Sequence, residues 1–247
     1  MQPVNYDVVA PGYDRRYQRN QYDGVRACLR RFIGDAPGAA VAEVGCGTGH
    51  WLADLSDRRF RLLAGLDLSR RMLEQAQITA PKALLVRGTA SRLPWADESF
   101  DRVFCVNALH HFPDKPAFIS ECRRVLRSGG GLLTIGLDPH RGDDRWWVYD
   151  FFPAALHADR RRYVSTGSIR DWLKTAGFRE PVTEVAQHLP SEMTFEVARR
   201  EGFIDRRSTS QLMVISDEDY AAGMSRMAAE QPVLRADLRL YATTAWA

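Results

Sequence analysis

The chain has little that would link it to a membrane, a secretion route or a nucleic acid. Its 247 residues contain no apolar run near the ~18 residues of a membrane-spanning helix. The first residues lack the basic and apolar regions of a signal peptide. The 34 basic and 31 acidic residues nearly balance, so no strong field attracts nucleic acid. We therefore expect a soluble, cytoplasmic protein with no membrane span and no nucleic-acid partner.

Cysteine is scarce and follows no metal-binding pattern. The four cysteines, at positions 28, 46, 105 and 122, form no Cys-x-x-Cys pair, and two of them fall at expected strand or glycine-loop positions. This spacing argues against a zinc site, and we expect no bound metal. Buried, reduced thiols are the expectation.

Glycine, by contrast, is concentrated in one informative segment. Residues 39–44 are small or branched and mostly apolar, as in a strand buried on both faces. Gly45, Gly47 and Gly49 follow at alternate positions, and apolar residues then recur at helical spacing. Without a Cβ, glycine allows tight turns and close approach of backbone N–H groups to a ligand. This order of elements indicates a nucleotide-type cofactor site.

Two acidic residues define the kind of cofactor. The next apolar run ends in Asp67, 20 residues after Gly47, where a carboxylate that accepts hydrogen bonds from ribose hydroxyls is expected. Glu43 would repel a pyrophosphate but suits a cofactor with an ammonium group, such as S-adenosylmethionine. A nicotinamide-dependent oxidoreductase is the rival from another class. Glu43 and the absence of Gly-x-Gly-x-x-Gly spacing disfavour it.

Five blocks of sequence carry a family resemblance, and they occur in the family's order: Glu43–Gly49, Leu66–Ser69, Arg87–Trp95, Ser99–His111 and Arg124–Gly130. With these blocks the chain resembles the class I S-adenosylmethionine-dependent methyltransferases. It is most similar to the ubiquinone/menaquinone-biosynthesis-like small-molecule branch, methyltransferase type 11. The resemblance covers roughly residues 35 to 140.

Alternation of strand-like and helical patterns predicts an α/β fold with a Rossmann-like, doubly wound sheet. The strand-like runs are 39–46, 61–67, 83–87, 101–107 and 131–137. The resemblance implies seven mostly parallel strands with an antiparallel last strand. We expect one domain, 1–247, made of a helical lid (1–34), a cofactor-binding core (35–140) and substrate-side helices with a C-terminal hairpin (141–247).

The last hundred residues have weaker patterns. We predict an aromatic helix over 146–157, a helix over 169–176, a strand over 178–189, a strand over Thr209–Ile215 and a helix over 217–229. Residues 190–207 would then be an insertion in the final hairpin. It has either a substrate-side or dimer-side role or a purely connecting one.

The resemblance also implies the cofactor contacts. Those at the methionine part are Glu43, the loop residues Gly45, Cys46, Gly47 and Gly49, and Asn107 through its carbonyl. Those at the nucleoside are Asp67 for the ribose, Leu68 for one adenine face, and Thr89 and Ala90 for the adenine edge. Many relatives have Asp at position 89, and a threonine hydroxyl accepts without charge. In the N-terminal lid, Tyr13 would cover the cofactor and Arg16 would meet its carboxylate.

Three histidines are the candidates for a catalytic base. Methyl transfer is an in-line displacement with an already activated electrophile, so the enzyme supplies alignment and, where the nucleophile carries a proton, a base. His111, His140 and His110 lie at expected strand ends and titrate near neutral pH. A local structural role is the alternative for each.

Aromatic residues after position 145 suggest an acceptor pocket. Trp146, Trp147 and Tyr149 are the candidates for its wall, and such a wall would favour a planar or hydrophobic acceptor. The alternative is that these rings only seal a helix to the sheet. The chain has Asn107-Ala108-Leu109-His110 and no Asn/Asp-Pro-Pro-Tyr motif, which argues against methylation of a base in nucleic acid.

We therefore expect a methyltransferase that moves the methyl of S-adenosyl-L-methionine to a small molecule and releases S-adenosyl-L-homocysteine. An O, N, S or C acceptor stays open. One alternative is a protein that binds S-adenosylmethionine with a non-methylating or lost activity. Another is a non-catalytic dimerising protein, and a homodimer is also open for the enzyme.

Overall fold

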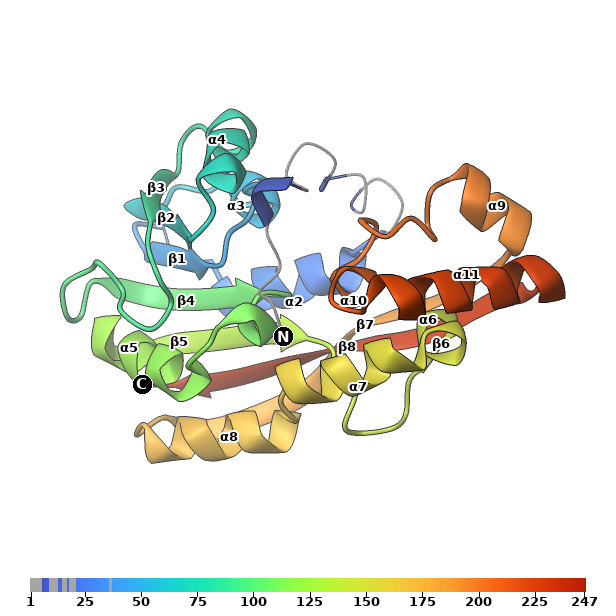
Figure 1. The fold of residues 1–247 in the computed structure, drawn as a ribbon. Helices are drawn as coiled ribbons and strands as arrows, with labels where there is room; N and C mark the ends of the chain where they lie inside the picture. Colours follow the sequence, from blue (N-terminus) through green and yellow to red (C-terminus); the bar gives the residue numbers. More distant parts are fainter. Residues whose placement is uncertain (1–5, 9–12, 15–16, 18–20, 36) are drawn as a thin grey trace. The chain divides into compact units, whose positions relative to one another are not determined.

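The computed structural model describes residues 6–8, 13–14, 17, 21–35 and 37–247. These residues form two compact units (Figure 1). The sheet unit contains the described residues up to Gly136, with Thr166–Gln187 and Leu240–Ala247. The helical unit contains Leu137–Ser165 and His188–Arg239. Strands β7 (Arg179–Thr194) and β8 (Val233–Trp246) contribute residues to both units.

The sheet unit is built on parallel strands. These are β1 (Ala40–Val44), β2 (Leu62–Asp67), β3 (Leu84–Arg87), β4 (Phe100–Val106) and β5 (Leu126–Gly136), in the spatial order β3-β2-β1-β4-β5. Strand β8 pairs antiparallel with β5, and β7 pairs with β8. Every residue of β1 is buried, as its apolar run predicts. The predicted mostly parallel sheet with an antiparallel last strand is confirmed.

Two helices of the sheet unit start at a side-chain cap. The helices of this unit are η1 (Tyr6–Val8), α2 (Asp23–Ile33), α3 (His50–Asp54), α4 (Arg70–Thr79), η3 (Leu109–His111), α5 (Lys115–Val125) and α8 (Thr166–Thr175). The Ser69 hydroxyl accepts the N–H of Met72 at the start of α4, and Asp114 accepts that of Ala117 in α5. Because β1 lies between β2 and β4, the strand order reverses at β1, and the carboxyl end of such a strand is where open parallel sheets bind ligands.

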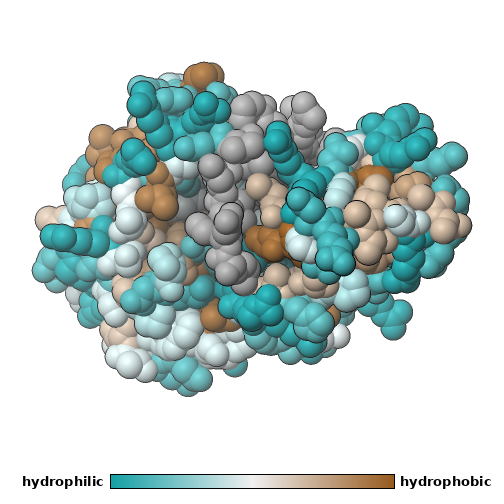
Figure 2. All heavy atoms as spheres, viewed as in Figure 1, coloured by the Kyte–Doolittle hydropathy of each residue, from teal (hydrophilic) through white to brown (hydrophobic). Residues whose placement is uncertain are grey.

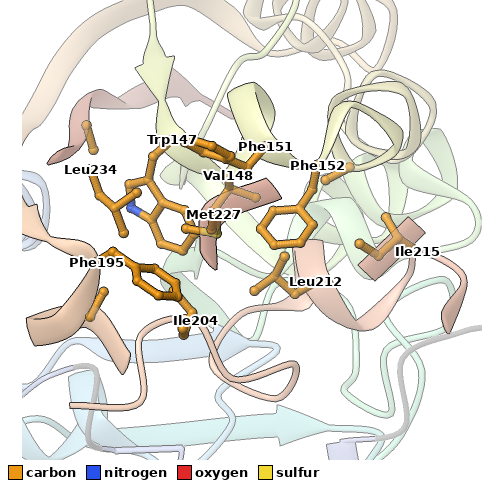
Figure 3. Packing of buried hydrophobic residues seen from close by; sticks show 13 residues of the cluster. Trp147, Val148, Phe151, Phe152, Phe195, Ile204, Leu212, Ile215, Met227 and Leu234 are labelled. Carbon is orange, nitrogen blue, oxygen red and sulfur yellow. The ribbon is translucent and has the colours of Figure 1, made fainter. Parts of the chain in front are cut away.

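The helical unit has its own apolar core (Figure 3). Its elements are β6 (Arg145–Trp146), α6 (Trp147–Phe151), α7 (Pro153–Arg162), α9 (Phe195–Arg200), α10 (Ser210–Met213) and α11 (Asp217–Glu230). Trp147, Phe152 and Phe195 pack in this core. A Cβ at Gly223 of α11 would lie 2.3 Å from Cδ1 of Phe152, so only glycine fits beside this ring.

The structure corrects several predictions for the C-terminal part. Thr209–Ile215 is not a strand, because Ser210–Met213 form a helix that buries Gln211 and Leu212 in the helical unit. The sheet of the described residues has eight strands where seven were expected. Of these, β6 is only two residues long. The predicted helix over 146–157 is two helices, broken at Phe152, and Trp146 belongs to β6.

The expected insertion over 190–207 also has a defined structure. Strand β7 continues to Thr194, and α9 follows with Phe195 and Ala198 buried in the core of the helical unit. The predicted helices over 169–176 and 217–229 are confirmed as α8 and α11. The sequence analysis missed β8, whose residues alternate in burial only over its first positions.

Surface and core properties fit this architecture. All four cysteines are buried free thiols, as predicted. No helix in the described part of the chain has the length and apolarity to cross a membrane. Hydrophilic side chains dominate the face in Figure 2. Among the described residues, no group of three or more His, Cys, Asp and Glu side chains could hold a metal ion.

Candidate functional site

The glycine loop after β1 is fastened to the end of β2. The N–H groups of Gly45 and Cys46 both donate to the carbonyl of Leu66, at 2.7 and 3.0 Å. The N–H of Gly47 donates to Oδ2 of Asp67 at 2.8 Å. The loop and the carboxylate that the sequence places 20 residues apart therefore meet at the carboxyl end of the sheet.

The three glycines have different reasons to be glycine. All have positive φ, +76° at Gly45, +53° at Gly47 and +81° at Gly49. A Cβ at Gly45 would lie 2.4 Å from Cβ of Ala108, and one at Gly49 would lie 3.1 Å from Cβ of Ala76. A Cβ at Gly47 would meet no described atom nearer than Cε1 of Tyr13, at 3.9 Å. Packing excludes a side chain at the first and third glycines, whereas a Cβ at the second would make only an ordinary contact with Tyr13.

Glu43 is the most unusual side chain of the site. It is 1% exposed, and its Oε2 has no hydrogen-bond partner among the described residues. Burial, and then the charge of Asp67, raise the pKa of Glu43 well above its ordinary value. A buried carboxylate without a partner is costly. The position is therefore suited to a positively charged or hydrogen-bond-donating ligand.

Asp67 is held by the backbone but retains acceptor capacity. Its Oδ1 accepts the N–H of Ser69 at 2.8 Å, and its Oδ2 accepts that of Gly47. Burial raises the pKa of Asp67, although these N–H groups oppose the rise. Each carboxylate oxygen has a further lone pair that can accept a ligand hydroxyl. Leu68 follows Asp67 in the sequence and is 64% exposed, so its apolar side chain is accessible.

The loop offers few free N–H groups to a phosphate. Those of Gly45, Cys46 and Gly47 donate to the end of β2, and that of Gly49 donates to the carbonyl of Cys46 at 2.9 Å. A pyrophosphate-binding loop instead presents such groups to its ligand. Together with buried Glu43, this geometry speaks against a dinucleotide.

The end of β3 adds a polar edge. The N–H of Gly88 donates to the carbonyl of Asp67 at 3.0 Å, which brings the start of this loop to the same strand end. Thr89 is exposed, with its hydroxyl 3.4 Å from that of Ser91, and Ala90 is buried. The position where many relatives have Asp is therefore an uncharged hydroxyl pair here.

Described residues of the N-terminal segment contact these loops. Asp7 accepts a hydrogen bond from the hydroxyl of Ser69 at 2.5 Å, and Asp14 accepts one from the hydroxyl of Thr48. Tyr17 stacks on His50 with ring centroids 3.5 Å apart. The sequence analysis named Tyr13 but missed the two carboxylates, because single acidic residues in a polar segment give no local signal. Arg16 lies outside the described residues.

The carboxyl end of β4 carries two of the three histidines. Asn107 has a φ of +51° and donates its N–H to the carbonyl of Ile135 at 2.7 Å. The following turn contains His110 and His111, with ring centroids 3.8 Å apart. Nε2 of His111 shares a hydrogen bond with the hydroxyl of Tyr6. The sequence did not indicate this partner, which is 105 residues away.

His140 belongs to the helical unit. Its Nε2 lies 3.1 Å from the carbonyl oxygen of Tyr163. A carbonyl only accepts, so Nε2 carries the proton in this hydrogen bond. The His140 residue is exposed.

The three predicted pocket residues have different surroundings within the helical unit. Trp147 is 5% exposed and belongs to the apolar core. Trp146 and Tyr149 are only partly buried and pack against that core. The Tyr149 hydroxyl donates to Oδ2 of Asp159 at 2.7 Å. Burial, and then the charge of Asp159, raise the pKa of Tyr149.

Comparison with known proteins gives consistent results. Residues 42–134 match a family model described as a methyltransferase domain. The chain is 39% identical over 192 residues to the phthiotriol/phenolphthiotriol dimycocerosates methyltransferase 1 of Mycobacterium ulcerans, covering 75% of this chain and 70% of that protein. It is 28% identical to the 27-O-demethylrifamycin SV methyltransferase of Amycolatopsis mediterranei, covering 80% and 74%.

A solved structure supports the fold. Phosphoethanolamine N-methyltransferase 2 of Haemonchus contortus, in complex with S-adenosyl-L-methionine, matches with a TM-score of 0.63 and 18% identity. The match covers 98% of this chain and 60% of that one.

Proposed function

We propose that this chain, which belongs to the class I S-adenosylmethionine-dependent methyltransferases that act on small molecules, methylates a hydroxyl oxygen of a hydrophobic acceptor. The names of two relatives support this choice of acceptor. One is named for phthiotriol and phenolphthiotriol dimycocerosates and the other for a 27-O-demethylrifamycin. Partly buried Trp146 and Tyr149 are the candidates for an apolar acceptor wall.

The residues after β1 and β2 fit the cofactor. Glu43, whose buried Oε2 has no partner among the described residues, would take the amino group of the methionine part, and Gly47, which has no side chain, would lie against the rest of that part. Asp67 would accept the ribose hydroxyls, with Leu68 at the adenine face and Thr89 and Ala90 at its edge. The fit rests on the Glu43 oxygen, because a buried acceptor without a partner, beside the second carboxylate of Asp67, favours a cationic or hydrogen-bond-donating ligand.

The bound cofactor supplies a methyl group already activated by its sulfonium. The chain itself must align the acceptor and remove the hydroxyl proton. His111 is the strongest candidate base, because it stands at the carboxyl end of β4 and is hydrogen-bonded to Tyr6. His110 and His140 are the alternatives.

Paired histidine variants test this assignment. His111→Gln should lower kcat by about 10²–10⁴-fold, the usual contribution of a general base. The KM for S-adenosylmethionine should stay near the wild-type value. Exposed His157→Gln on α7 is the matched control, with the same change at a histidine outside the three candidates. An unchanged kcat in His111→Gln would contradict the role of this residue as base.

The acceptor class is tested by a substrate series. Hydrophobic aromatic compounds that differ only in carrying a hydroxyl, amino or thiol group should be compared with labelled S-adenosylmethionine. We expect label mainly in the hydroxyl compounds, and preferential labelling of amines would contradict the proposal. A homodimer and a cytoplasmic location stay predictions, which light scattering and cell fractionation can test.

A further inference from the structure

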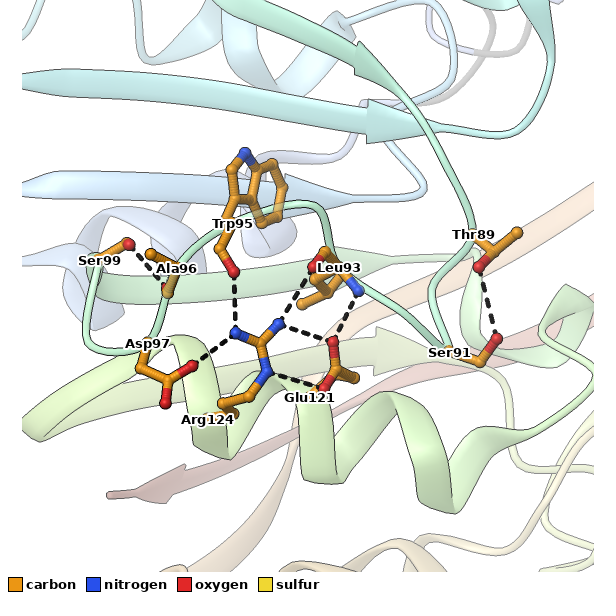
Figure 4. A network of polar contacts seen from close by, with 9 residues as sticks. All are labelled: Thr89, Ser91, Leu93, Trp95, Ala96, Asp97, Ser99, Glu121 and Arg124. Atoms are coloured by element: carbon orange, nitrogen blue, oxygen red, sulfur yellow. Dashed lines mark hydrogen bonds and ion pairs between the residues drawn. The ribbon is translucent and has the colours of Figure 1, made fainter.

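The loop from Gly88 to Ser99 is held by two side chains of α5 (Figure 4). Apart from one bridge between Thr89 and Arg92, this loop contains no helix or strand. Its backbone groups therefore need partners from elsewhere. Glu121 and Arg124, one turn apart on α5, provide them.

The contacts fix the loop at its centre. Oε2 of Glu121 accepts the N–H of Leu93 at 2.7 Å, and Nη2 of Arg124 donates to the carbonyl of the same residue at 3.1 Å. Nη1 of Arg124 donates to the carbonyl of Trp95 at 2.8 Å. Both backbone groups of Leu93 are thus satisfied by a charged side chain, as they would be by a neighbouring strand.

The two side chains also hold each other in place. Nε and Nη2 of Arg124 each lie 2.8 Å from an oxygen of Glu121. This bidentate pair restricts both side chains. These hydrogen bonds lower the pKa of Glu121, so it is ionised at neutral pH. Asp97 also accepts from Arg124, but its side chain is 74% exposed and contributes little.

The loop from Gly88 to Ser99 contains Thr89 and Ala90, the residues expected at the adenine edge. Its start is tied to the sheet by the hydrogen bond from Gly88 to Asp67, and its centre is tied to α5 at Leu93. Thr89 and Ala90 lie between these two attachments. Leu93 is only 3% exposed, so the second attachment is set into the core.

We propose that Glu121 and Arg124 are positioning residues for the adenine end of the cofactor. By fixing Leu93 and Trp95, they would hold Thr89 and Ala90 in place for the adenine edge. The inference rests on the proposed assignment of Thr89 and Ala90 to the adenine edge. Loss of the hydrogen bonds from Glu121 and Arg124 should therefore weaken recognition of adenine. The methionine part, held by the loop after β1, should keep its contacts.

The test compares Arg124→Gln with Arg123→Gln. Arg123 directly precedes Arg124 on α5, and within the described residues it donates no hydrogen bond to this loop. Isothermal titration should measure binding of S-adenosylhomocysteine and of S-inosylhomocysteine, in which a carbonyl oxygen replaces the adenine amino group. We expect Arg124→Gln to bind S-adenosylhomocysteine about tenfold more weakly or worse.

Discrimination between the two ligands is the decisive readout. Wild type and Arg123→Gln should prefer S-adenosylhomocysteine, and Arg124→Gln should lose most of this preference. With saturating cofactor, kcat of Arg124→Gln should stay within about twofold of wild type, because the reacting methyl is held elsewhere. A general loss of folding would lower kcat and the binding of both ligands alike.

Two results would overturn different statements. Full affinity and full discrimination in Arg124→Gln would overturn the positioning role. Equal binding of both ligands by wild type would instead overturn the adenine-edge assignment in the proposed function. Should Arg124→Gln fail to fold, Glu121→Gln keeps an oxygen for Leu93 but loses the charge, and it should shift discrimination in the same direction by less. Wild-type discrimination in a folded Glu121→Gln would then overturn the positioning role.

Discussion

Each unit of the molecule buries a carboxylate, and the two carboxylates differ in their hydrogen-bond partners. Asp159 in the helical unit is 0% exposed and accepts hydrogen bonds from Tyr149, Arg162 and Gln211. Glu43 in the sheet unit is 1% exposed, and its Oε2 has no partner among the described residues. The satisfied carboxylate joins α6, α7 and α10. We attribute the unsatisfied one to a ligand.

This difference separates a structural acid from a binding acid. Removing Asp159 should damage the fold, because its partners would be left buried and unpaired. Replacing Glu43 by its amide should leave the stability of the free protein unchanged, because the free protein favours the uncharged, protonated acid. Stability and cofactor affinity should therefore respond in opposite patterns to changes in the two units.

The largest expected effect is on stability, in the helical unit. Asp159→Asn should lower the free energy of unfolding by about 3–5 kcal/mol, because buried Arg162 loses its counter-charge. Urea denaturation measures this loss, and Asp150→Asn on the exposed side of α6 is the control. A loss below about 1 kcal/mol would show that the network is not structural.

The next effect is on cofactor binding, in the sheet unit. Asp67→Ala should weaken S-adenosylmethionine binding by about 1.5–3 kcal/mol, roughly tenfold or more, because charge-assisted hydrogen bonds to the ribose are lost. Isothermal titration measures this, with exposed Asp57→Ala as control. Wild-type affinity in Asp67→Ala would remove the ribose assignment.

Two glycines of the loop allow a finer comparison. Gly45→Ala should destabilise the free protein by about 1–3 kcal/mol more than Gly47→Ala, because its Cβ would overlap Ala108. Gly47→Ala should instead act mainly on cofactor affinity, by adding a methyl group where the cofactor would approach the loop. Thermal unfolding with and without cofactor distinguishes these effects. Equal stability of the two variants would contradict the different roles assigned to them.

The smallest effect is the pH dependence of cofactor affinity. The raised pKa of Glu43 means that the free protein favours its protonated form, and a cationic amino group favours the ionised form. Affinity should therefore rise with pH up to that pKa, by at most tenfold or about 1.4 kcal/mol per pH unit. Titration in buffers of different ionisation enthalpy should detect the released proton. Proton release that persists in Glu43→Gln would assign it to another group.

The raised pKa of Glu43 also determines the direction in which the stability of the folded protein changes with pH. Because the folded pKa is raised, the contribution of Glu43 is fully present below its ordinary pKa and is lost as pH rises through the folded value.

Local patterns explain how much of the structure could be predicted. The run from residue 39 to Gly49 and the apolar segment ending in Asp67 specify strand, turn and carboxylate by neighbouring residues alone. The apolar run Thr209–Ile215 predicts a strand for the same reason, yet Ser210–Met213 form a helix, in which Gln211 hydrogen-bonds to buried Asp159. Tyr6 beside His111 and Arg124 beside Leu93 arise from tertiary contacts that no local pattern contains.

The most direct test of the account is Glu43→Gln, with S-adenosylmethionine affinity and the Tm of the free protein measured together. We predict that affinity falls about tenfold or more while the Tm of the free protein does not fall, because the amide keeps the shape of the protonated acid. Unchanged affinity, or a fall in Tm like that expected for Asp159→Asn, would show that Glu43 is a structural acid.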